Sequence, residues 1–285
     1  MELKILKRMK KNDAVRRLLQ NRLAILGIIV LFSFFFLAIF APLIAPHDPY
    51  DSDFLNTLKS PSSSHLLGQD DLGRDVLSRI IYGSRISITI GFISVAIGII
   101  IGVPIGAISG YYGGKIDLIV QRFVDIMMAF PGILLAILIV AVMGVGLVNA
   151  MIAVGVVSIP TYIRLVRGSV LSLKNEEYVK AARSVGASHF YIIFKHILPH
   201  CLAPLIVQSS LQVGTAILWA AGLGFLGLGA QAPTPEWGAM LSQGRGYIRT
   251  AHHVTTFPGI AIMLTVLGFN LVGDGLRDAL DPRMD

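Results

Sequence analysis

Residues 175–199, NEEYVKAARSVGASHFYIIFKHILP, organise this chain: they form a charged, glycine-containing interruption between two long apolar runs. Asn175 is a residue type that caps helices, and Glu176 and Glu177 in a first turn suit the positive end of the helix dipole. The two glutamates stand four and three residues before Lys180, so either can pair with it along one helix face. The pattern predicts a short helix with a charged face.

The second half of this segment predicts a turn and a second helix. Gly186 supplies the left-handed residue that ends the first helix, and Ser188 can cap the next one. Pro199 opens the following apolar run, at a position where its missing N–H costs little. We therefore expect a helix–turn–helix at a membrane surface, a shape suited to docking to another protein.

The composition is that of a membrane protein. Hydrophobic residues make up 54% of the 285 residues and charged residues 14%, and the mean hydropathy is +0.71. Soluble domains contain about 25% charged residues, so we place this chain in a lipid bilayer. The net charge of +7 could suggest nucleic acid. However, the basic residues gather in the N-terminal tail and beside apolar runs, which indicates membrane topology and lipid headgroups and argues against nucleic-acid binding.

The apolar runs predict an all-α, polytopic membrane protein with about six transmembrane helices. Residues 1–22 form a basic tail that places the N-terminus in the cytoplasm, and residues 23–46 are too long for a cleaved signal and form the first helix. A polar loop at 47–85 then lies outside. Five further helices fill residues 86–274, with the long cytoplasmic loop at 168–199, and a charged cytoplasmic tail at 275–285 ends the chain.

Small residues and prolines punctuate these predicted helices. Glycines at four-residue spacing (Gly98, Gly102, Gly106 and Gly110) predict a helix that packs closely against a neighbour. We expect the fourth span to be broken at Pro160. Arg122 and Asp125 are three residues apart and can pair on one helix face near the cytoplasm.

Polar residues on the fifth span are candidates for a transport path. Gln208 and Gln212 are four residues apart and share a face, with Thr215 close by. Such a stripe can line a wet path or hydrogen-bond to a neighbouring helix, and the sequence favours neither.

The loop at 47–85 contains HLLGQDDLGRDVLSR, residues 65–79. One interpretation is a surface that engages a partner protein or an outer gate; the other is a solvated turn with local Asp–Arg pairs.

Trp237, in a proline-rich outer turn, suits the membrane interface. His252 and His253 are adjacent and lack Cys or acidic companions, and the single Cys201 rules out a Cys-rich site, so we expect no metal site.

Several functional motifs are absent from the sequence. It has no Gly-x-x-x-x-Gly-Lys-Ser/Thr phosphate loop, no Gly-x-Ser-x-Gly elbow and no His-Glu-x-x-His helix, so we expect neither ATP binding nor enzymatic activity in this chain. The middles of the predicted spans also lack acidic residues, which ion-coupled carriers usually place there.

Three stretches of the sequence resemble known families. Ala181-Ala182, three residues, Gly186 and a stretch closing on Leu198-Pro199 resemble the Glu-Ala-Ala loop of ABC importer permeases, in which a cytoplasmic coupling helix sits in a cleft of the ATPase. Lys180 stands where the family has its glutamate and His196 where it often has isoleucine; Glu177, one turn earlier, can take over the acidic contact. The 65–79 stretch and GLGFLGLGAQAPTPEWG, residues 222–238, resemble peptide and nickel permeases. Gln69 replaces a threonine of that pattern, and the residues that match it are Asp70, Gly73, Arg74, Asp75, Ser78 and Arg79.

The resemblance implies a permease subunit of an ABC importer for dipeptides or oligopeptides in a bacterial or archaeal cell membrane. It implies two ATPase subunits that bind the ATP and magnesium, an extracytoplasmic binding protein, and a second permease chain in a heterodimer. The residues expected to contact the ATPase are Glu177, Lys180, Ala181, Ala182, Gly186, Leu198 and Pro199. The alternatives are the same machine carrying nickel or oligosaccharides, an ion-coupled carrier that works alone, and a membrane scaffold with no conduit.

Overall fold

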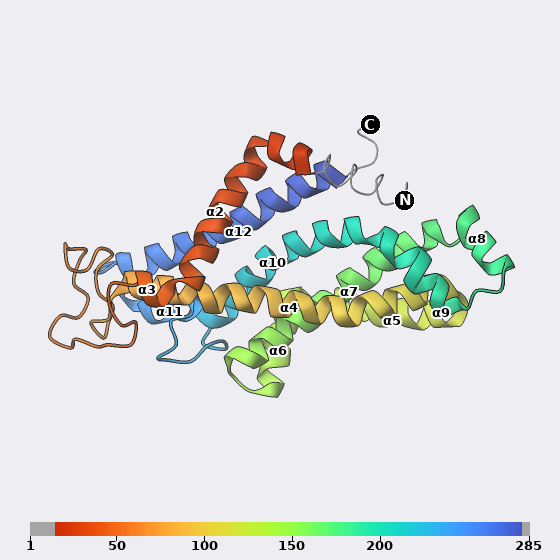
Figure 1. Cartoon of the computed structure of the whole chain (residues 1–285). Helices are drawn as coiled ribbons and strands as arrows, with labels where there is room; N and C mark the ends of the chain where they lie inside the picture. The colour runs from red at the N-terminus through yellow and green to blue at the C-terminus, as the bar shows by residue number, and fades with distance from the viewer. Residues whose placement is uncertain (1–14, 281–285) are drawn as a thin grey trace.

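The computed structural model describes residues 15–280, which form an elongated bundle of α-helices (Figure 1). Within these described residues, five helical segments are long and apolar enough to cross a membrane. They are α2 (Arg22–Ile39), α4 (Val76–Tyr112), α7 (Leu147–Leu173), the segment His189–Phe225 that ends in α10 (Leu202–Phe225), and α12 (His253–Leu280). Two further helices, α5 (Gly114–Ala129) and α6 (Gly132–Met143), meet at a bend of 93° and count as a sixth span if taken together. The all-α, polytopic prediction is confirmed. Residues 1–14 of the predicted tail at 1–22, and residues 281–285 of the predicted tail at 275–285, lie outside the described residues.

Helices α4 and α7 approach each other through the predicted glycines. A Cβ atom built on Gly98 would lie 2.2 Å from Ser158 Oγ, and one on Gly106 would lie 2.6 Å from the Ile163 carbonyl oxygen. Gly102 and Gly110 face Tyr162 and Arg167 of α7 in the same way. The glycine spacing therefore lets α4 and α7 approach closely, as predicted. In lipid, such close van der Waals packing drives helix association.

Helix boundaries differ from those expected at both sides of the first loop. Helix α2 ends at Ile39, and a single turn, α3 (Ala41–Ile44), follows with a proline at its start. Helix α4 begins at Val76, ten residues before the expected boundary, because the Asp75 carboxylate accepts hydrogen bonds from the Ser78 N–H and hydroxyl, both at 2.7 Å. Such a cap starts a helix even where the following residues are polar.

Prolines act differently in the third and fourth spans. Pro131 separates α5 from α6, and its extended backbone lies at the bend. Pro160 lies inside α7 without ending it, so the predicted break is wrong. Pro104 likewise lies inside α4. Membrane helices tolerate an internal proline when neighbouring helices pack against them, and α4 and α7 pack closely along this stretch.

The segment after α10 folds back into the bundle. Trp237 begins α11 (Trp237–Gly244) and is fully buried, with its indole N–H donating to the Ile80 carbonyl at 3.1 Å. The expectation that it lies at the membrane interface is wrong because Gly83 of α4 leaves room for its ring. Glu236 caps α11 by accepting from the N–H groups of Gly238 and Ala239, and burial raises the pKa of its carboxyl group.

The closeness of α4 and α7 gives the first prediction. Replacing Gly106 with alanine places a methyl group against backbone atoms of Ile163 that cannot rotate away, which should cost about 1–3 kcal/mol of unfolding free energy. The matched control is Gly168→Ala in α7, where a Cβ meets nothing within 4 Å. Thermal unfolding of the detergent-purified chain should show a lower Tm for G106A and an equal or higher Tm for G168A. Equal Tm values for wild type and G106A would contradict tight packing at this point.

Candidate functional site

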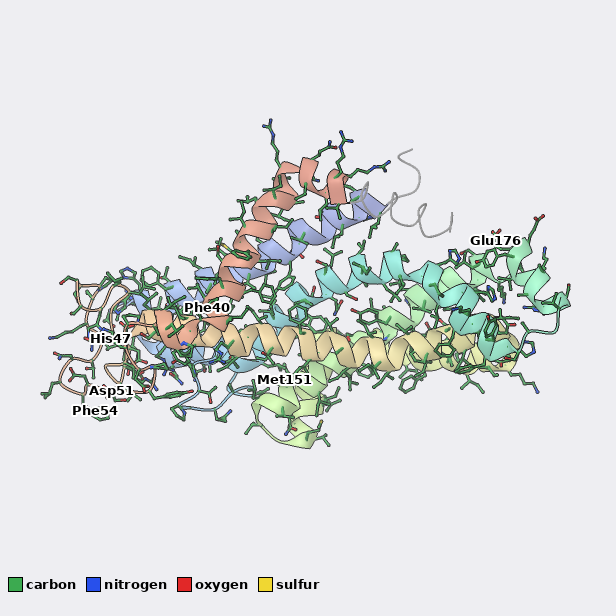
Figure 2. All side chains as sticks on the ribbon, in the orientation of Figure 1. Phe40, His47, Asp51, Phe54, Met151 and Glu176 are labelled. Atoms are coloured by element: carbon green, nitrogen blue, oxygen red, sulfur yellow. The ribbon has the colours of Figure 1, made fainter. Side chains whose placement is uncertain are left out.

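The coupling segment, defined here as residues 177–199, lies at the opposite end of the bundle from the loop at 47–75 (Figure 1). Its first helix is α8 (Glu177–Ser184). Glu176, and not Asn175 as expected, is the N-cap residue, because α7 continues to Leu173 and the Glu176 N–H bonds back to the Leu173 carbonyl at 3.1 Å. Figure 2 shows Glu176 at this end of the molecule.

The turn after α8 forms as predicted. Gly186 has a φ of +82°. Its N–H bonds to the Arg183 carbonyl and the Ala187 N–H to the Ala182 carbonyl, both at 3.1 Å. These two bonds form a Schellman motif, which requires a left-handed residue. Ser188 then caps α9 (His189–Tyr191) by accepting from the Tyr191 N–H at 3.3 Å.

The chain continues from α9 to α10 through two irregular turns. A π-helical turn covers Ile192–Ile197, and a 3₁₀ turn covers Leu198–Cys201 with Pro199 near its start. Proline lacks the N–H that a regular α-helix would need at this position. Pro199, expected to open the apolar segment, lies in the 3₁₀ turn that joins the π-helical turn to the α-helix α10.

The coupling segment presents a mixed surface. Glu176, Glu177 and Lys180 are exposed, and within residues 15–280 neither glutamate forms an ion pair with Lys180, so the predicted pair is not formed. Ala181 and Pro199 are also exposed, Leu198 is half-buried, and Ala182 is buried. Four large apolar side chains are among the exposed ones: Val185, Phe190, Tyr191 and Phe194.

Three contacts join the C-terminal end of α4 to the coupling segment and to Lys174 just before it. The Tyr111 hydroxyl lies 2.9 Å from His189 Nδ1, and Arg183 donates to the same hydroxyl at 3.4 Å. The Lys174 ammonium donates to the Gly110 carbonyl at 2.9 Å. No sequence signal pointed to these contacts, because they join residues more than 60 positions apart.

Two ion pairs fasten α5 to α7 near the same end. Arg167 binds both carboxylate oxygens of Asp117, at 2.6 and 2.7 Å. Arg164 binds Asp125 at 2.7 Å, so the predicted pairing of Asp125 with Arg122 is wrong. Helices α5 and α7 pack against each other, so Arg164 of α7 reaches Asp125 across this contact and takes the place expected for Arg122.

At the other end of the bundle, the charged residues of the 65–79 stretch form a buried cluster. Arg74 donates to the Asp70 carboxylate at 2.7 Å, and Arg79 Nε lies 3.3 Å from the same oxygen. Both guanidinium groups also reach the Gln243 side chain of α11, and Arg79 donates to the backbone carbonyl of Pro49 at 3.1 Å. Asp70, Arg74 and Arg79 are each no more than 3% exposed. The pairs are local as one interpretation expected, but they are not solvated.

Gly73 and His253 make further contacts that hold this loop in a compact fold. Gly73 has a φ of +76°, and a Cβ there would collide with the Asp53 carbonyl. The backbone at Gly73 therefore lies directly against the backbone at Asp53. His253 Nε2 lies 3.1 Å from the Gln69 carbonyl, which gives this histidine a structural contact. Burial and the neighbouring Asp70 carboxylate raise the pKa of Asp71. The loop is thus a compact unit that α4, α11 and α12 support.

The predicted polar stripe of α10 is only partly open. A cavity of about 600 Å³ lies beside α10, and its walls include Gln208, His200 and Arg277. Gln208 donates to Gln212 at 3.5 Å, but Gln212 is buried and does not line this cavity. Thr215 donates to the Leu211 carbonyl of its own helix and lies away from the cavity too. Of the three, Gln208 alone faces an open space here.

Comparison with known proteins places this fold in a transport family. A family described as binding-protein-dependent transport system inner membrane component matches residues 102–285. The N-terminal TM domain of oligopeptide transport permease C matches residues 11–61.

Individual relatives cover nearly the whole chain. The dipeptide transport system permease protein DppC of Alkalihalophilus pseudofirmus is 53% identical over 95% of this chain and 90% of its own length. The glutathione transport system permease protein GsiD of Pectobacterium atrosepticum is 48% identical over 94% and 90%. A chain of the MetNI methionine ABC transporter, solved in an inward-facing conformation, shares the fold with a TM-score of 0.59 at 22% identity, covering 72% of this chain and 98% of that one.

The buried cluster gives the second prediction. Arg79→Ala removes a guanidinium that contacts Asp70, Gln243 and Pro49, and should cost about 2–3 kcal/mol because buried acceptors lose a charged donor. Arg85→Ala is the matched control, since Arg85 is exposed on the same helix. Limited proteolysis of the purified chain should cut R79A within residues 47–75 faster than wild type or R85A. Identical cleavage of R79A and R85A would show that Arg79 does not hold the loop.

Proposed function

Because this chain belongs to the family of binding-protein-dependent transport system inner membrane components, we propose that it is the permease subunit of an ATP-driven importer of dipeptides or short oligopeptides. The observation that carries the cargo class is the 53% identity to a dipeptide permease over 95% of the chain. The family is one of integral membrane proteins, in agreement with the apolar helices.

The coupling segment is the part we assign to the ATPase contact. It projects from the end of the bundle and exposes apolar side chains, among them Val185 at 84% and Phe190 at 69%, which a partner surface can cover. Around them lie the exposed residues Glu177, Lys180, Ala181, Gly186 and Pro199, while Ala182 and Leu198 pack beneath. ATP and magnesium bind to two ATPase subunits and not to this chain, whose sequence has no phosphate loop.

Contacts described above supply a route from the ATPase to the membrane helices. A displacement of α8 and α9 pulls on Arg183 and His189, and through them on Tyr111 at the end of α4. Helix α7 follows, because it leads directly into α8 and packs along α4. Different contacts in the two ATPase states would then bias the bundle between inward- and outward-facing arrangements.

The opposite end of the molecule is assigned to the extracytoplasmic binding protein. In this orientation both termini are cytoplasmic and the basic residues Arg167, Lys174 and Arg183 lie on the cytoplasmic side, as the positive-inside rule requires. The signature residues Asp70, Gly73, Arg74, Asp75 and Arg79 shape the loop from within, and Phe54 and Leu55, which are 72% and 93% exposed, offer the contact surface (Figure 2).

The transport path requires a second permease chain. Gln208 lines the cavity beside α10, on a wall that stays open in the single chain. We propose that a related but different permease covers this wall in a heterodimer, and that Gln208 contacts the cargo while Gln212 and Thr215 support α10 from behind. Lipid covers the remaining apolar surface.

A second cargo follows from a specific observation. The glutathione permease is 48% identical to this chain, and glutathione is itself a small peptide. Nickel and oligosaccharides remain alternative cargoes, since the binding protein selects the cargo in such a machine. An ion-coupled carrier or a scaffold is disfavoured by membership of the family.

The experiment that tests this function is copurification of the assembled complex through a C-terminal tag, followed by ATP hydrolysis in lipid nanodiscs. The binding protein loaded with a dipeptide should stimulate hydrolysis several-fold, and the empty binding protein should not. Stimulation by nickel or an oligosaccharide, and not by a dipeptide or glutathione, would overturn the cargo class. A chain that purifies alone, with no ATPase, would overturn the importer itself.

The turn at Gly186 gives the third prediction. Its φ of +82° costs a β-branched residue about 1–2 kcal/mol, whereas asparagine tolerates this conformation. A Cβ there meets nothing within 4 Å, so the two substitutions differ in backbone strain and not in packing. We expect Gly186→Val to reduce ATP-driven dipeptide uptake by about tenfold or more and Gly186→Asn to retain most of it. Uptake should be measured in proteoliposomes at equal amounts of inserted protein; equal rates for both variants would contradict the role of this turn.

A further inference from the structure

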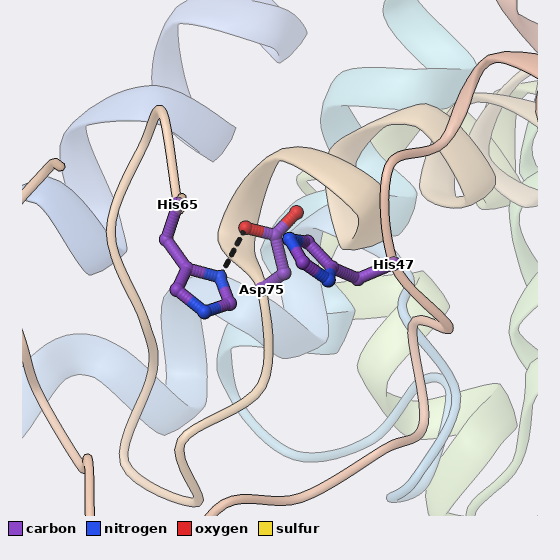
Figure 3. A group of neighbouring side chains, drawn as sticks. All are labelled: His47, His65 and Asp75. Carbon is purple, nitrogen blue, oxygen red and sulfur yellow. Dashed lines mark hydrogen bonds and ion pairs between the residues drawn. The ribbon is translucent and has the colours of Figure 1, made fainter. Parts of the chain in front are cut away.

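Two histidines and one aspartate from separate parts of the loop meet at the start of α4 (Figure 3). His47 follows α3, His65 lies in the middle of the loop, and Asp75 is the N-cap of α4. One ring nitrogen from each histidine and one carboxylate oxygen of Asp75 all lie within 4.8 Å of one another. No other group of three or more His, Cys, Asp or Glu side chains with this closeness occurs within residues 15–280.

We propose that these three residues bind a divalent transition metal ion, with zinc as the best match. Two imidazoles and one carboxylate are a common ligand set for zinc, which leaves further positions for water. In a tetrahedral zinc site, bonds of about 2.0–2.1 Å place neighbouring ligand atoms about 3.4 Å apart. His65 Nδ1 and Asp75 Oδ1 already lie 3.0 Å apart, so a small separation of the two groups admits the ion.

Surrounding contacts hold the three ligands in place. The second carboxylate oxygen of Asp75 accepts from the N–H and hydroxyl of Ser78, both at 2.7 Å, and this leaves Oδ1 for the metal. The Ser78 hydroxyl in turn accepts from the His47 N–H at 3.0 Å. The two imidazole rings are stacked, with centroids 4.5 Å apart. A preformed ligand set of this kind binds a metal at little conformational cost, and such supporting contacts orient ligands in metal sites.

The site is electrostatically suited to a cation. It opens into a cavity of about 180 Å³ whose walls carry three further aspartates, Asp48, Asp51 and Asp53. The Asp75 carboxylate itself is 1% exposed, and His65 is 23% exposed. In the metal-free loop His65 Nδ1 donates its proton to Asp75, because a carboxylate only accepts. The metal takes the place of that proton, so its binding releases a proton from His65.

Direct zinc binding tests the proposal. The full chain, purified without a histidine tag and stripped with a chelator, is titrated with zinc chloride at pH 7.5 against a chromophoric competitor. We expect one zinc ion per chain for wild type, and affinity at least about tenfold lower for His47→Ala and for His65→Ala, since even supporting contacts contribute tenfold or more. His252→Ala is the matched control, because His252 is exposed and outside the group. Less than half an equivalent bound to wild type, or equal losses in H252A and H65A, would overturn the site.

Two further measurements keep the proposal testable if a histidine variant is unstable. Cobalt(II) in place of zinc should give visible absorption bands of low coordination number with wild type and H252A but not with H47A. Excess zinc should also raise the Tm of wild type and H252A and leave that of H65A unchanged, because an ion that binds only the folded state stabilises it. An identical rise in all variants would show that the zinc binds elsewhere and would overturn the proposal. None of these measurements depends on transport or on an ATPase.

Discussion

The close contact between α4 and α7 is the constraint on which the other features depend. Glycines on α4 allow close approach of α7 along about three helical turns, with Gly98 at one end of the contact and Gly110 at the other. Because α4 runs from Val76 to Tyr112, this contact holds a helix that reaches both functional ends of the molecule. Its first turn carries Asp75 and Arg79, and its last turn carries Tyr111. The loop and the coupling segment are therefore attached to opposite ends of the same helix.

Charges in the described residues gather at the two ends of the bundle. The buried cluster of Asp70, Arg74 and Arg79 lies at one end, and the Asp117–Arg167 and Asp125–Arg164 pairs lie towards the other. Between them the helices hold each other by close packing and by hydroxyl groups such as Ser94, which donates to the Met151 carbonyl. This distribution suits a bilayer, because placing a charged side chain at the centre of a bilayer costs free energy.

Several features that depend on glycine and serine at fixed positions could be predicted from the sequence, whereas the local ion pairs and the Asn175 cap could not. Gly186 and Ser188 follow from capping chemistry, and the glycine series from helix periodicity, and the structure shows both. Features that depend on a distant partner could not. Asp125 forms its ion pair with Arg164 of another helix and not with its neighbour Arg122. Trp237 lies inside the bundle because Gly83, about 150 positions away, leaves space for its ring. Similarly, His47, His65 and Asp75 have no ligand-like spacing in sequence and meet only when the loop folds.

One consequence follows from the two internal prolines. Each of them removes a backbone hydrogen bond, Pro104 in α4 and Pro160 in α7, and so creates the most easily bent point of its helix. Gly102 contacts the Ile159 carbonyl, which puts both weak points at nearly the same depth in the bundle. The paired helices thus share a hinge plane, and a bend in one can be matched by the other without loss of their contact. A bend at this plane would leave each half intact, with the loop on one side of the plane and the coupling segment on the other.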